Sequence, residues 1–369
     1  MRIIMSGGGT GGHIYPAITI LKAIQQQVKD CEVLFIGTEH GLEADIIPKE
    51  GFAFQTIEVR GFERRLSMKN VHTITKTIGS VWKSRRIIRK FKPDIVIGTG
   101  GYVCGPVLLA ASLLKVPTMI QEQNVIPGIT NKILSRFVNK IAVGYEEASK
   151  FFTDQNKVFV SGNPIRQEVM TATREEGILA LGLDPDKRTI LISGGSRGAR
   201  SINRAMIEVH RHFAGRKDIQ LLHVTGQSEY NDIVGNLKQS CIDITKAGNI
   251  IIKPYLYNMP QALAVADIAV FRAGAIGLAE LTARGIASIL VPYPFAAENH
   301  QEFNARVMEK QGAAEVIRDA ELNGARLIEV INELVNSPER LAAMAIASKK
   351  IGRPEAAHSI ADMALTISR

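Results

Sequence analysis

The sequence predicts an α/β fold of two doubly wound domains, each a parallel sheet with helices on both faces. Short runs rich in Val and Ile alternate with longer helical patterns, which is typical of such sheets. The alternation starts afresh at "TILISGG", residues 189–195, after a Gly-Asn-Pro break in "SGNPIR", 161–166. A chain of 369 residues is also too long for one ordinary domain and comfortable for two.

The expected strands follow this alternation along the chain. In the first half they are residues 2–5, 33–36, 95–98, 118–120, 141–143 and 158–160; in the second half they are 189–195, 219–224, 249–252, 267–271, 287–291 and 313–317. Helices are expected between them, for example at 16–28 and 129–137, and a last one at about 354–368 after a Gly-Arg-Pro break.

Composition narrows the class of protein. Hydrophobic residues make up 46% and charged residues 22%, which suits large packed cores rather than disorder. The 3 cysteines are far apart, so a disulfide or metal scaffold is not expected. No run of 18 apolar residues occurs, and "MRIIMSGGG" reaches glycines before a signal sequence can form.

The net charge of +9 is concentrated in one segment, residues 60–92. This segment holds eleven Lys and Arg and a single acid, Glu63. A local excess of this kind indicates an anionic partner.

The first glycine loop follows the first expected strand. Residues 7–12 satisfy GxGxxG and are followed at once by His13. Glycines let backbone amides approach an anion at a helix N-terminus. A Walker A loop is excluded because no Lys-Ser/Thr follows. A dinucleotide-binding loop would not explain His13. It would also need an acid for the ribose at the end of the second strand, where only Glu39 occurs, and later than expected. A tight turn without a ligand is the alternative.

Three further glycine-rich segments follow later strands: "GTGGYVCGP" at 98–106, "GGSRGARS" at 194–201 and "RAGAIGLAE" at 272–280. The third segment adds groups that can bind an anion: the hydroxyl of Ser196 and the cations Arg197 and Arg200. In the fourth segment, Glu280 can accept hydrogen bonds from ribose hydroxyls. The pattern predicts two phosphate-bearing substrates, one for each domain. The alternatives are close helix–sheet packing for the second loop and a solvated carboxylate for Glu280.

Polar side chains follow other strands. In "QEQNVIPGITNK", 121–132, Glu122 and Asn124 are expected to line a polar wall, or else to organise a turn. In "ENHQEFNA", 298–305, Gln301 and Asn304 lie one turn apart and can reach a sugar or form a polar helix surface. "DPD" at 184–186 precedes a strand, so we interpret it as a turn rather than a metal site.

The order and spacing of these motifs resemble the MurG family of peptidoglycan glycosyltransferases, from residue 1 to about 350. The motifs that carry the resemblance are "GGGTGGHIYPA", "GTGGYVCGP", "EQNVIPGITNK", "SGNPIR", "GGSRGAR", "RAGA…AE" and "ENHQEFNA". It implies a GT-B fold with an acceptor and membrane-docking domain, 1–163, and a donor domain, 164–351. The C-terminal helix, about 352–369, is implied to pack back on the first domain.

The resemblance implies inverting transfer of N-acetylglucosamine from UDP-GlcNAc to the C4 hydroxyl of lipid I, giving lipid II and UDP. His13 resembles the family's base, or a positioning group, and no metal or other cofactor is expected. The implied donor contacts are Thr10, Gly11, Gly12, Asn124, Arg166, Ser196, Tyr255, Leu256, Gly274, Ala275, Ile276, Gly277, Leu278, Ala279, Glu280 and Gln301. The implied acceptor contacts are Gly100, Gly101, Tyr102, Glu122 and Asn131. Gly277 departs from a hydroxyl residue common in the family, which weakens a side-chain role in diphosphate binding.

The acceptor implied by the resemblance carries a lipid that stays in the bilayer, so the basic segment is expected to bind the membrane surface. Among its apolar residues are Phe62, Leu66, Met68, Ile78, Val81 and Trp82. Apolar side chains among cations suit an anionic membrane surface, implying peripheral attachment at the cytoplasmic face of the cell membrane. An amphipathic helix packed on the sheet is the alternative, and no motif supports nucleic acid. Cell-wall and division proteins are possible partners.

Three competing functions remain. Another GT-B lipid glycosyltransferase would share the UDP site. An NAD(P)-dependent oxidoreductase would use the first glycine loop for its cofactor. A non-catalytic membrane adaptor would keep the fold without turning over the sugar nucleotide.

Overall fold

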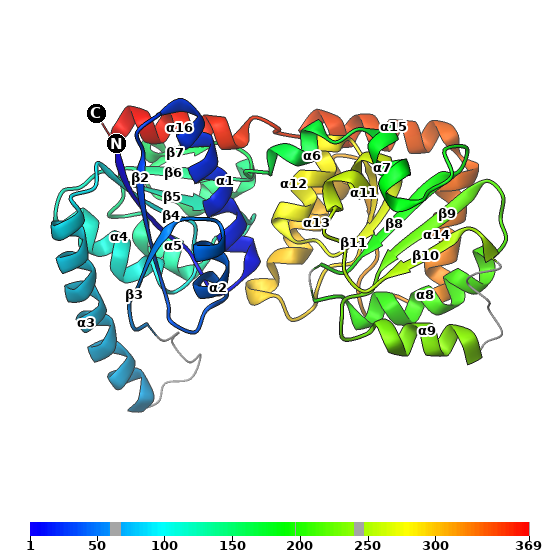
Figure 1. Cartoon of the computed structure of the whole chain (residues 1–369), viewed down its shortest axis with the longest axis horizontal. Coiled ribbons are helices and arrows are strands. Elements are labelled where there is room, and N and C mark those ends of the chain that lie inside the picture. The colour runs from blue at the N-terminus through cyan, green and yellow to red at the C-terminus, as the bar shows by residue number, and fades with distance from the viewer. Residues whose placement is uncertain (60–67, 196, 240–246, 369) are drawn as a thin grey trace. The chain divides into compact units, whose positions relative to one another are not determined.

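A computed structural model describes residues 1–59, 68–195, 197–239 and 247–368, with the backbone alone for 68–77. The chain forms two compact units: unit 1 is Met1–Ile165 with Pro354–Arg369, and unit 2 is Arg166–Arg353. Each unit contains a parallel sheet covered by helices (Figure 1). The first part of unit 1 ends at Ile165, two residues after the boundary predicted at 163. The chain returns to unit 1 at Pro354, the last residue of the Gly-Arg-Pro break.

Unit 1 is built on a seven-stranded sheet of order β3-β2-β1-β4-β5-β6-β7. Its strands are β1 Arg2–Ser6, β2 Glu32–Gly37, β3 Ala53–Thr56, β4 Ile95–Gly98, β5 Thr118–Glu122, β6 Lys140–Val143 and β7 Val158–Val160. Its helices are α1 Gly11–Gln27, α2 Leu42–Lys49, α3 Met68–Phe91, α4 Cys104–Leu113, α5 Ile129–Leu134 and α16 Ala356–Ile367, with 3₁₀ turns η1 Glu146–Phe151 and η2 Gln155–Lys157.

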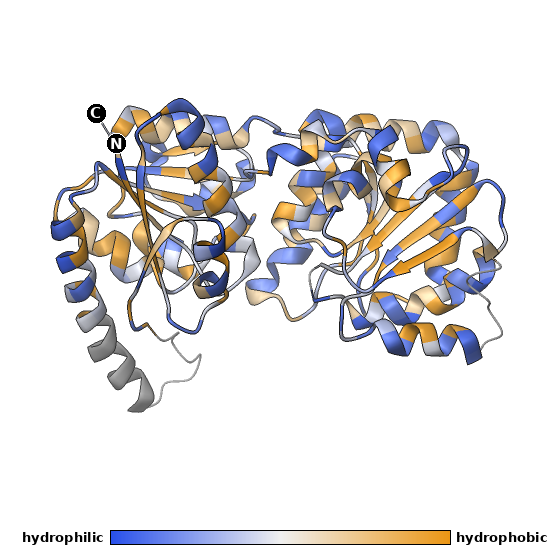
Figure 2. Cartoon of the chain, viewed as in Figure 1, coloured by the Kyte–Doolittle hydropathy of each residue, from blue (hydrophilic) through white to orange (hydrophobic). Residues whose placement is uncertain are grey.

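Alternate strand residues of unit 1 face opposite helical layers. Ile3 and Met5 pack in a core with α1, α2 and α16, while Ile4 packs with α3, α4 and α5. This alternation is the two-residue period of a strand buried on both faces. Figure 2 accordingly shows the strands mainly as apolar.

Unit 2 repeats the scheme with a six-stranded sheet of order β10-β9-β8-β11-β12-β13. Its strands are β8 Arg188–Ser193, β9 Ile219–Val224, β10 Ile250–Lys253, β11 Ala266–Phe271, β12 Ala287–Leu290 and β13 Ala314–Val316. Its helices are α6 Gln167–Thr171, α7 Arg174–Leu181, α8 Arg200–Phe213, α9 Tyr230–Gln239, α11 Met259–Val265, α12 Ala275–Arg284, α13 His300–Lys310, α14 Gly324–Asn336 and α15 Pro338–Ile351, with the 3₁₀ turn η3 Ala297–Asn299.

Two predictions of local structure are wrong. The first helix begins at Gly11 rather than at residue 16. Residues Gly11 to His13 form its first turn, and Pro16 lies inside the helix without ending it. Strand β3 was not predicted, since Ala53–Thr56 is a half-exposed edge strand without Val or Ile.

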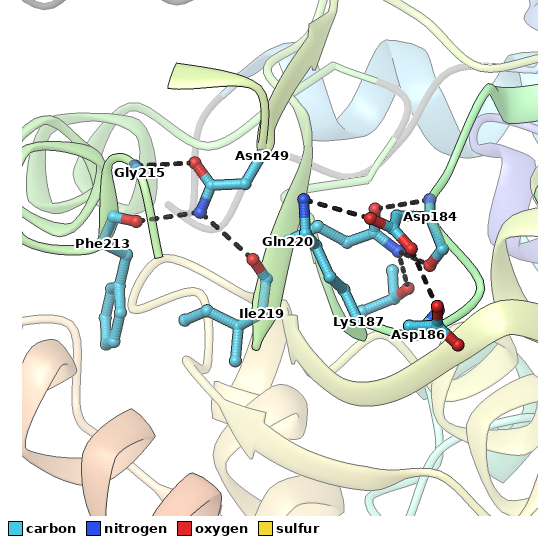
Figure 3. A network of polar contacts seen from close by, with 9 residues as sticks. Asp184, Asp186, Lys187, Phe213, Gly215, Ile219, Gln220 and Asn249 are labelled. Atoms are coloured by element: carbon cyan, nitrogen blue, oxygen red, sulfur yellow. Dashed lines mark hydrogen bonds and ion pairs between the residues drawn. The ribbon is translucent and has the colours of Figure 1, made fainter. Parts of the chain in front are cut away.

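The "DPD" segment is a turn, as predicted. The amide of Asp186 donates to Asp184 Oδ1 at 3.0 Å, and Gln220 exchanges two hydrogen bonds with the backbone of Asp184 (Figure 3). Nearby, Asn249 joins the end of α8 to β9 by donating to the carbonyls of Phe213 and Ile219. These side chains fix connections at the amino ends of the strands, away from the glycine loops.

A buried histidine pair lies in the core of unit 2. His210 on α8 and His223 on β9 are both fully buried, and His210 Nε2 lies 3.0 Å from His223 Nδ1. Burial lowers the pKa of His210 to about 3 and, with the charge of His210, lowers that of His223 well below its usual value. Both rings are therefore neutral in the folded protein at pH 7.

We expect His210→Gln to make the stability of unit 2 less sensitive to acid. A histidine whose pKa is depressed on folding takes up its proton more readily when unfolded. The free energy of unfolding therefore falls as pH drops below about 6.5, by up to about 1.4 kcal/mol per pH unit for each ring. Urea unfolding at several pH values measures this slope. Val209→Ala should lower stability without changing the slope, and an unchanged slope in His210→Gln would contradict the expectation.

Candidate functional site

The glycine loops lie at the topological switch point of each sheet. Strands β1 and β4 are neighbours in unit 1, and β8 and β11 are neighbours in unit 2, so the strand order reverses there. The loops that leave these strand pairs are the four predicted glycine-rich segments. Ligands of open parallel sheets bind at such points, outside the carboxyl ends of the strands.

In unit 1 the first two glycine loops pack directly on each other. The Gly8 amide donates to the Gly100 carbonyl at 3.3 Å. Gly101 has φ +87°, and a Cβ there would overlap the Gly8 carbonyl oxygen. Close packing, the alternative given for the second loop, therefore accounts for Gly101 without a ligand.

His13 lies in the first turn of α1 with a defined tautomer. Its Nδ1 lies 2.9 Å from the carbonyl oxygen of Gly8. Since a carbonyl can only accept, Nδ1 of the neutral ring carries the proton and Nε2 is left as an acceptor. A Cβ at Gly100 would lie 3.0 Å from Nε2, so the glycine leaves room for the ring. This arrangement suits proton abstraction at Nε2.

The carboxylate of Glu43 on α2 holds the first glycine loop by a hydrogen bond from its backbone. This role was not predicted from the sequence. The carboxylate is fully buried and accepts hydrogen bonds from the Gly9 amide, the Thr38 amide and the Thr38 hydroxyl, at 3.0, 3.0 and 2.6 Å. Burial raises its pKa, but these hydrogen bonds outweigh burial and lower it overall. A carboxylate on the Gly9 amide disfavours a phosphate there, which argues against the dinucleotide interpretation.

Glu122 organises the loop that follows β5. Its carboxylate accepts from the amides of Asn124 and Gly128 and from Asn131 Nδ2, at 2.9, 3.0 and 2.8 Å. Glu122 and Asn131 are 2% and 3% exposed, whereas Asn124 is half-buried. The structure therefore supports the turn-organising alternative for Glu122 and places Asn131 beneath the same loop.

In unit 2 the N-terminus of α12 is open. Gly274 is the N-cap residue, and neither a capping side chain nor an acid occupies the first turn. A Cβ at Gly274 would meet nothing within 4 Å, and one at Gly277 would only touch Phe271 at 3.8 Å. Packing therefore does not require these two glycines, in contrast to Gly101. The backbone amides of the first turn, which no described side chain caps, and the helix dipole make this terminus suitable for an anion.

Glu280 of α12 pairs with Arg166. Arg166 Nη2 and Nε contact Oε1 at 3.0 and 3.3 Å, and Oε2 has no hydrogen-bond partner among the described residues. Glu280 is 8% exposed, so the solvated-carboxylate alternative is wrong. Burial raises the pKa of Glu280, and the charge of Arg166 opposes that rise.

The remaining predicted residues of unit 2 follow other strands. Tyr255, half-exposed, stacks edge-on against Tyr257 after β10, and the neighbouring Leu256 is buried. Gln301 Oε1 accepts from the Tyr293 amide at 3.0 Å. Asn304 is fully buried and donates to the Ala273 carbonyl at 3.3 Å, so it supports the loop before α12. Ser196 lies outside the described residues.

The other unit 1 residues lie on its loops. Thr10 and Gly12 are exposed at the start of α1, with Gly11 half-buried between them, and Tyr102 is 55% exposed in the second glycine loop. Thr10, Gly11, Gly12 and Asn124, predicted as donor contacts, thus belong to unit 1, whereas the other described donor contacts belong to unit 2.

The described part of the basic segment belongs mainly to α3. Ile78 and Trp82, one turn apart, are 56% and 67% exposed. Exposed cations continue beyond them: Lys83, Arg86, Arg89, Lys90 and Lys92. Val81 instead packs partly buried on the core, so its predicted place on the docking surface is wrong. Phe62, Leu66 and the side chain of Met68 lie outside the described residues. None of the helices described combines the length and apolar character needed to cross a bilayer.

Comparisons with known proteins agree with this arrangement. Residues 3–143 match the glycosyltransferase family 28 N-terminal domain, and residues 189–360 match its C-terminal domain. Relatives from Halothermothrix orenii and Bacillus pumilus are each 48% identical, over 98% and 97% of this chain and 98% and 96% of their own. Both are named UDP-N-acetylglucosamine–N-acetylmuramyl-(pentapeptide) pyrophosphoryl-undecaprenol N-acetylglucosamine transferase.

Solved structures extend the comparison. The crystal structure of Acinetobacter baumannii MurG has a TM-score of 0.78 and 26% identity, covering 99% of both chains. A UDP-GlcNAc 2-epimerase from Neisseria meningitidis, with a TM-score of 0.68 and 15% identity over 99% of this chain and 100% of its own, shares the fold alone.

Two doubly wound parallel-sheet domains that match the two domains of a glycosyltransferase family make this chain a GT-B glycosyltransferase. The chain belongs to glycosyltransferase family 28 and, within it, to the MurG family.

Proposed function

We propose that the protein transfers N-acetylglucosamine from UDP-GlcNAc to the C4 hydroxyl of lipid I, undecaprenyl-diphospho-MurNAc-pentapeptide, giving lipid II and UDP. Family membership over the whole chain supports the substrates. The observation that carries the mechanism is the 2.9 Å contact between His13 Nδ1 and the Gly8 carbonyl oxygen, which leaves Nε2 to accept a proton.

Unit 1 supplies the base in this proposal. His13 Nε2 takes the proton of the C4 hydroxyl as its oxygen forms a bond to C1 of N-acetylglucosamine. Attack from the face opposite the diphosphate inverts the anomeric centre and breaks the bond from C1 to the phosphate oxygen. Gly100, Gly101 and Tyr102 are proposed to contact the acceptor, and Glu122 and Asn131 to hold the loop beside it.

Unit 2 holds the leaving group. The amides of Ala275, Ile276 and Gly277 stabilise the charge that develops on UDP, together with Arg166. Glu280 accepts from ribose hydroxyls through Oε2, while Arg166 keeps Oε1. We propose that the remaining predicted donor residues also contact UDP-GlcNAc and that the reaction needs no metal.

A transfer assay tests the function. Radiolabelled UDP-GlcNAc and a short-chain lipid I analogue are incubated with the wild-type protein, and we expect label in the lipid fraction. A folded protein that binds UDP but leaves the analogue unlabelled would contradict the acceptor assignment and favour another lipid glycosyltransferase. Binding of NAD(P) instead of UDP would favour the oxidoreductase.

We further propose that α3 docks unit 1 on the anionic cytoplasmic surface of the cell membrane. Ile78 and Trp82 lie one turn apart, with Lys83 and Arg86 beside and beyond them on the exposed side. Apolar side chains enter the interface while cations bind anionic headgroups. Part of the helix packs inward through Ser80, Ser84 and Ile88, so the amphipathic-helix alternative describes its inner face.

Trp82 gives a direct test because it is the only tryptophan of the chain. Its fluorescence should shift to shorter wavelength with vesicles containing anionic lipid, and less so at high salt. Trp82→Ala should weaken vesicle binding about ten- to hundred-fold, since burying a large apolar side chain contributes about 1.5–3 kcal/mol. Leu179→Ala, an 86% exposed residue of α7 in unit 2, is the matched control. Unchanged binding of Trp82→Ala would exclude this face.

A further inference from the structure

The backbone of His13 is held by a residue of the loop that follows β4. Thr99 follows β4 and is fully buried, and its hydroxyl donates to the His13 carbonyl at 2.8 Å. A Cβ at Gly7 would overlap this hydroxyl. The bare backbone of Gly7 thus lets Thr99 reach the turn that carries the imidazole.

Thr99 is held in turn by a buried amide. Gln123 follows β5, is 2% exposed, and donates from Nε2 to the Thr99 carbonyl at 2.7 Å. Asn163 donates from Nδ2 to the Gln123 carbonyl at 2.9 Å and accepts at Oδ1 from Gln121 Nε2 at 3.0 Å. A polar chain with little freedom therefore runs from the end of β7 through β5 and β4 to α1. Such buried networks are rigid because each broken bond leaves a buried polar group unpaired.

We infer that Thr99 and Gln123 are positioning residues for His13 in the transfer reaction. Thr99 binds the carbonyl of His13 rather than its ring nitrogens, and Gln123 binds the carbonyl of Thr99. Together with Gly8, which holds Nδ1, they determine where Nε2 points. The inference rests on the proposed role of His13 as base. A displacement of the reacting atoms by about 1 Å can cost on the order of 10²-fold in rate.

The test compares Thr99→Val, Thr99→Ser and Thr118→Val in the transfer assay. Thr99→Val keeps the shape and removes the hydroxyl, and we expect kcat to fall about ten- to hundred-fold with KM for both substrates nearly unchanged. Thr99→Ser should restore most of kcat. Thr118 is also fully buried in this sheet, but its hydroxyl bonds Asn139 at the amino end of β5. Thr118→Val should keep the wild-type kcat.

A double-mutant cycle separates positioning from general stability. If Thr99 acts through His13, Thr99→Val should cost little further rate in a His13→Ala background. An equal fall of kcat in both backgrounds, or a wild-type kcat in Thr99→Val, would overturn the inference. If Thr99→Val is poorly folded, Gln123→Leu is measured in the same cycle, with the same expectation. A wild-type protein that binds UDP but transfers no sugar would overturn the proposed function itself, and the positioning role with it.

Discussion

His13→Ala is expected to lower kcat for sugar transfer by about 10²–10⁴-fold, the range that a positioned general base contributes. Without Nε2, the C4 hydroxyl must lose its proton to water. His13→Gln can still donate to the Gly8 carbonyl, but it provides no base, so its rate should be similarly low. Initial rates with saturating donor and acceptor measure this loss.

The affinity for UDP is the control for His13. Isothermal titration calorimetry should give the same dissociation constant for His13→Ala and wild type, because the proposed diphosphate contacts lie in unit 2. A variant with wild-type kcat would exclude His13 as the base.

Glu280→Gln is expected to weaken UDP binding by about one to two orders of magnitude. A hydrogen bond to a charged group contributes about 1.5–3 kcal/mol, and each 1.4 kcal/mol is a factor of ten in affinity. The amide keeps the shape but loses the charge that faces Arg166 and the ribose. Calorimetry with UDP measures the change. Glu309→Gln, which alters an exposed ion pair with Arg306 on α13, should leave the affinity unchanged.

The stability of Glu280→Gln should move the other way. Burial raises the pKa of Glu280 on folding, so its contribution to stability is full below its unfolded pKa and is lost as pH rises through the folded value. At neutral pH the wild type therefore carries a cost of burying the charge, and Glu280→Gln should unfold at the same or higher urea concentration. A variant that binds UDP like the wild type would exclude Glu280 from the donor site.

Much of the fold was predictable because strand and loop signals are local. Each Val- and Ile-rich strand, each glycine loop after a switch-point strand and the break near residue 163 is a signal contained within a few consecutive residues. The structure confirms two parallel sheets. Strand β3 and the start of α1 were not predictable, because an edge strand needs few apolar residues and a first helical turn tolerates glycine.

The candidate site divides in the same way. By itself the sequence determined which loops are glycine-rich, that His13 follows the first of them, that the cations gather in one segment, and to which family the motifs belong. Tertiary structure alone decided that Gly101 serves packing while Gly274 leaves a helix end open, and that Ile78 faces out where Val81 faces in. The tertiary structure also brought Thr99 into hydrogen-bond contact with the His13 backbone, and Gln123 into contact with Thr99. The reason is that the carboxyl ends of parallel strands lie at one edge of a sheet, where residues far apart in sequence come together. Which of these residues become neighbours depends on the strand order, and the crossover connections between strands determine that order.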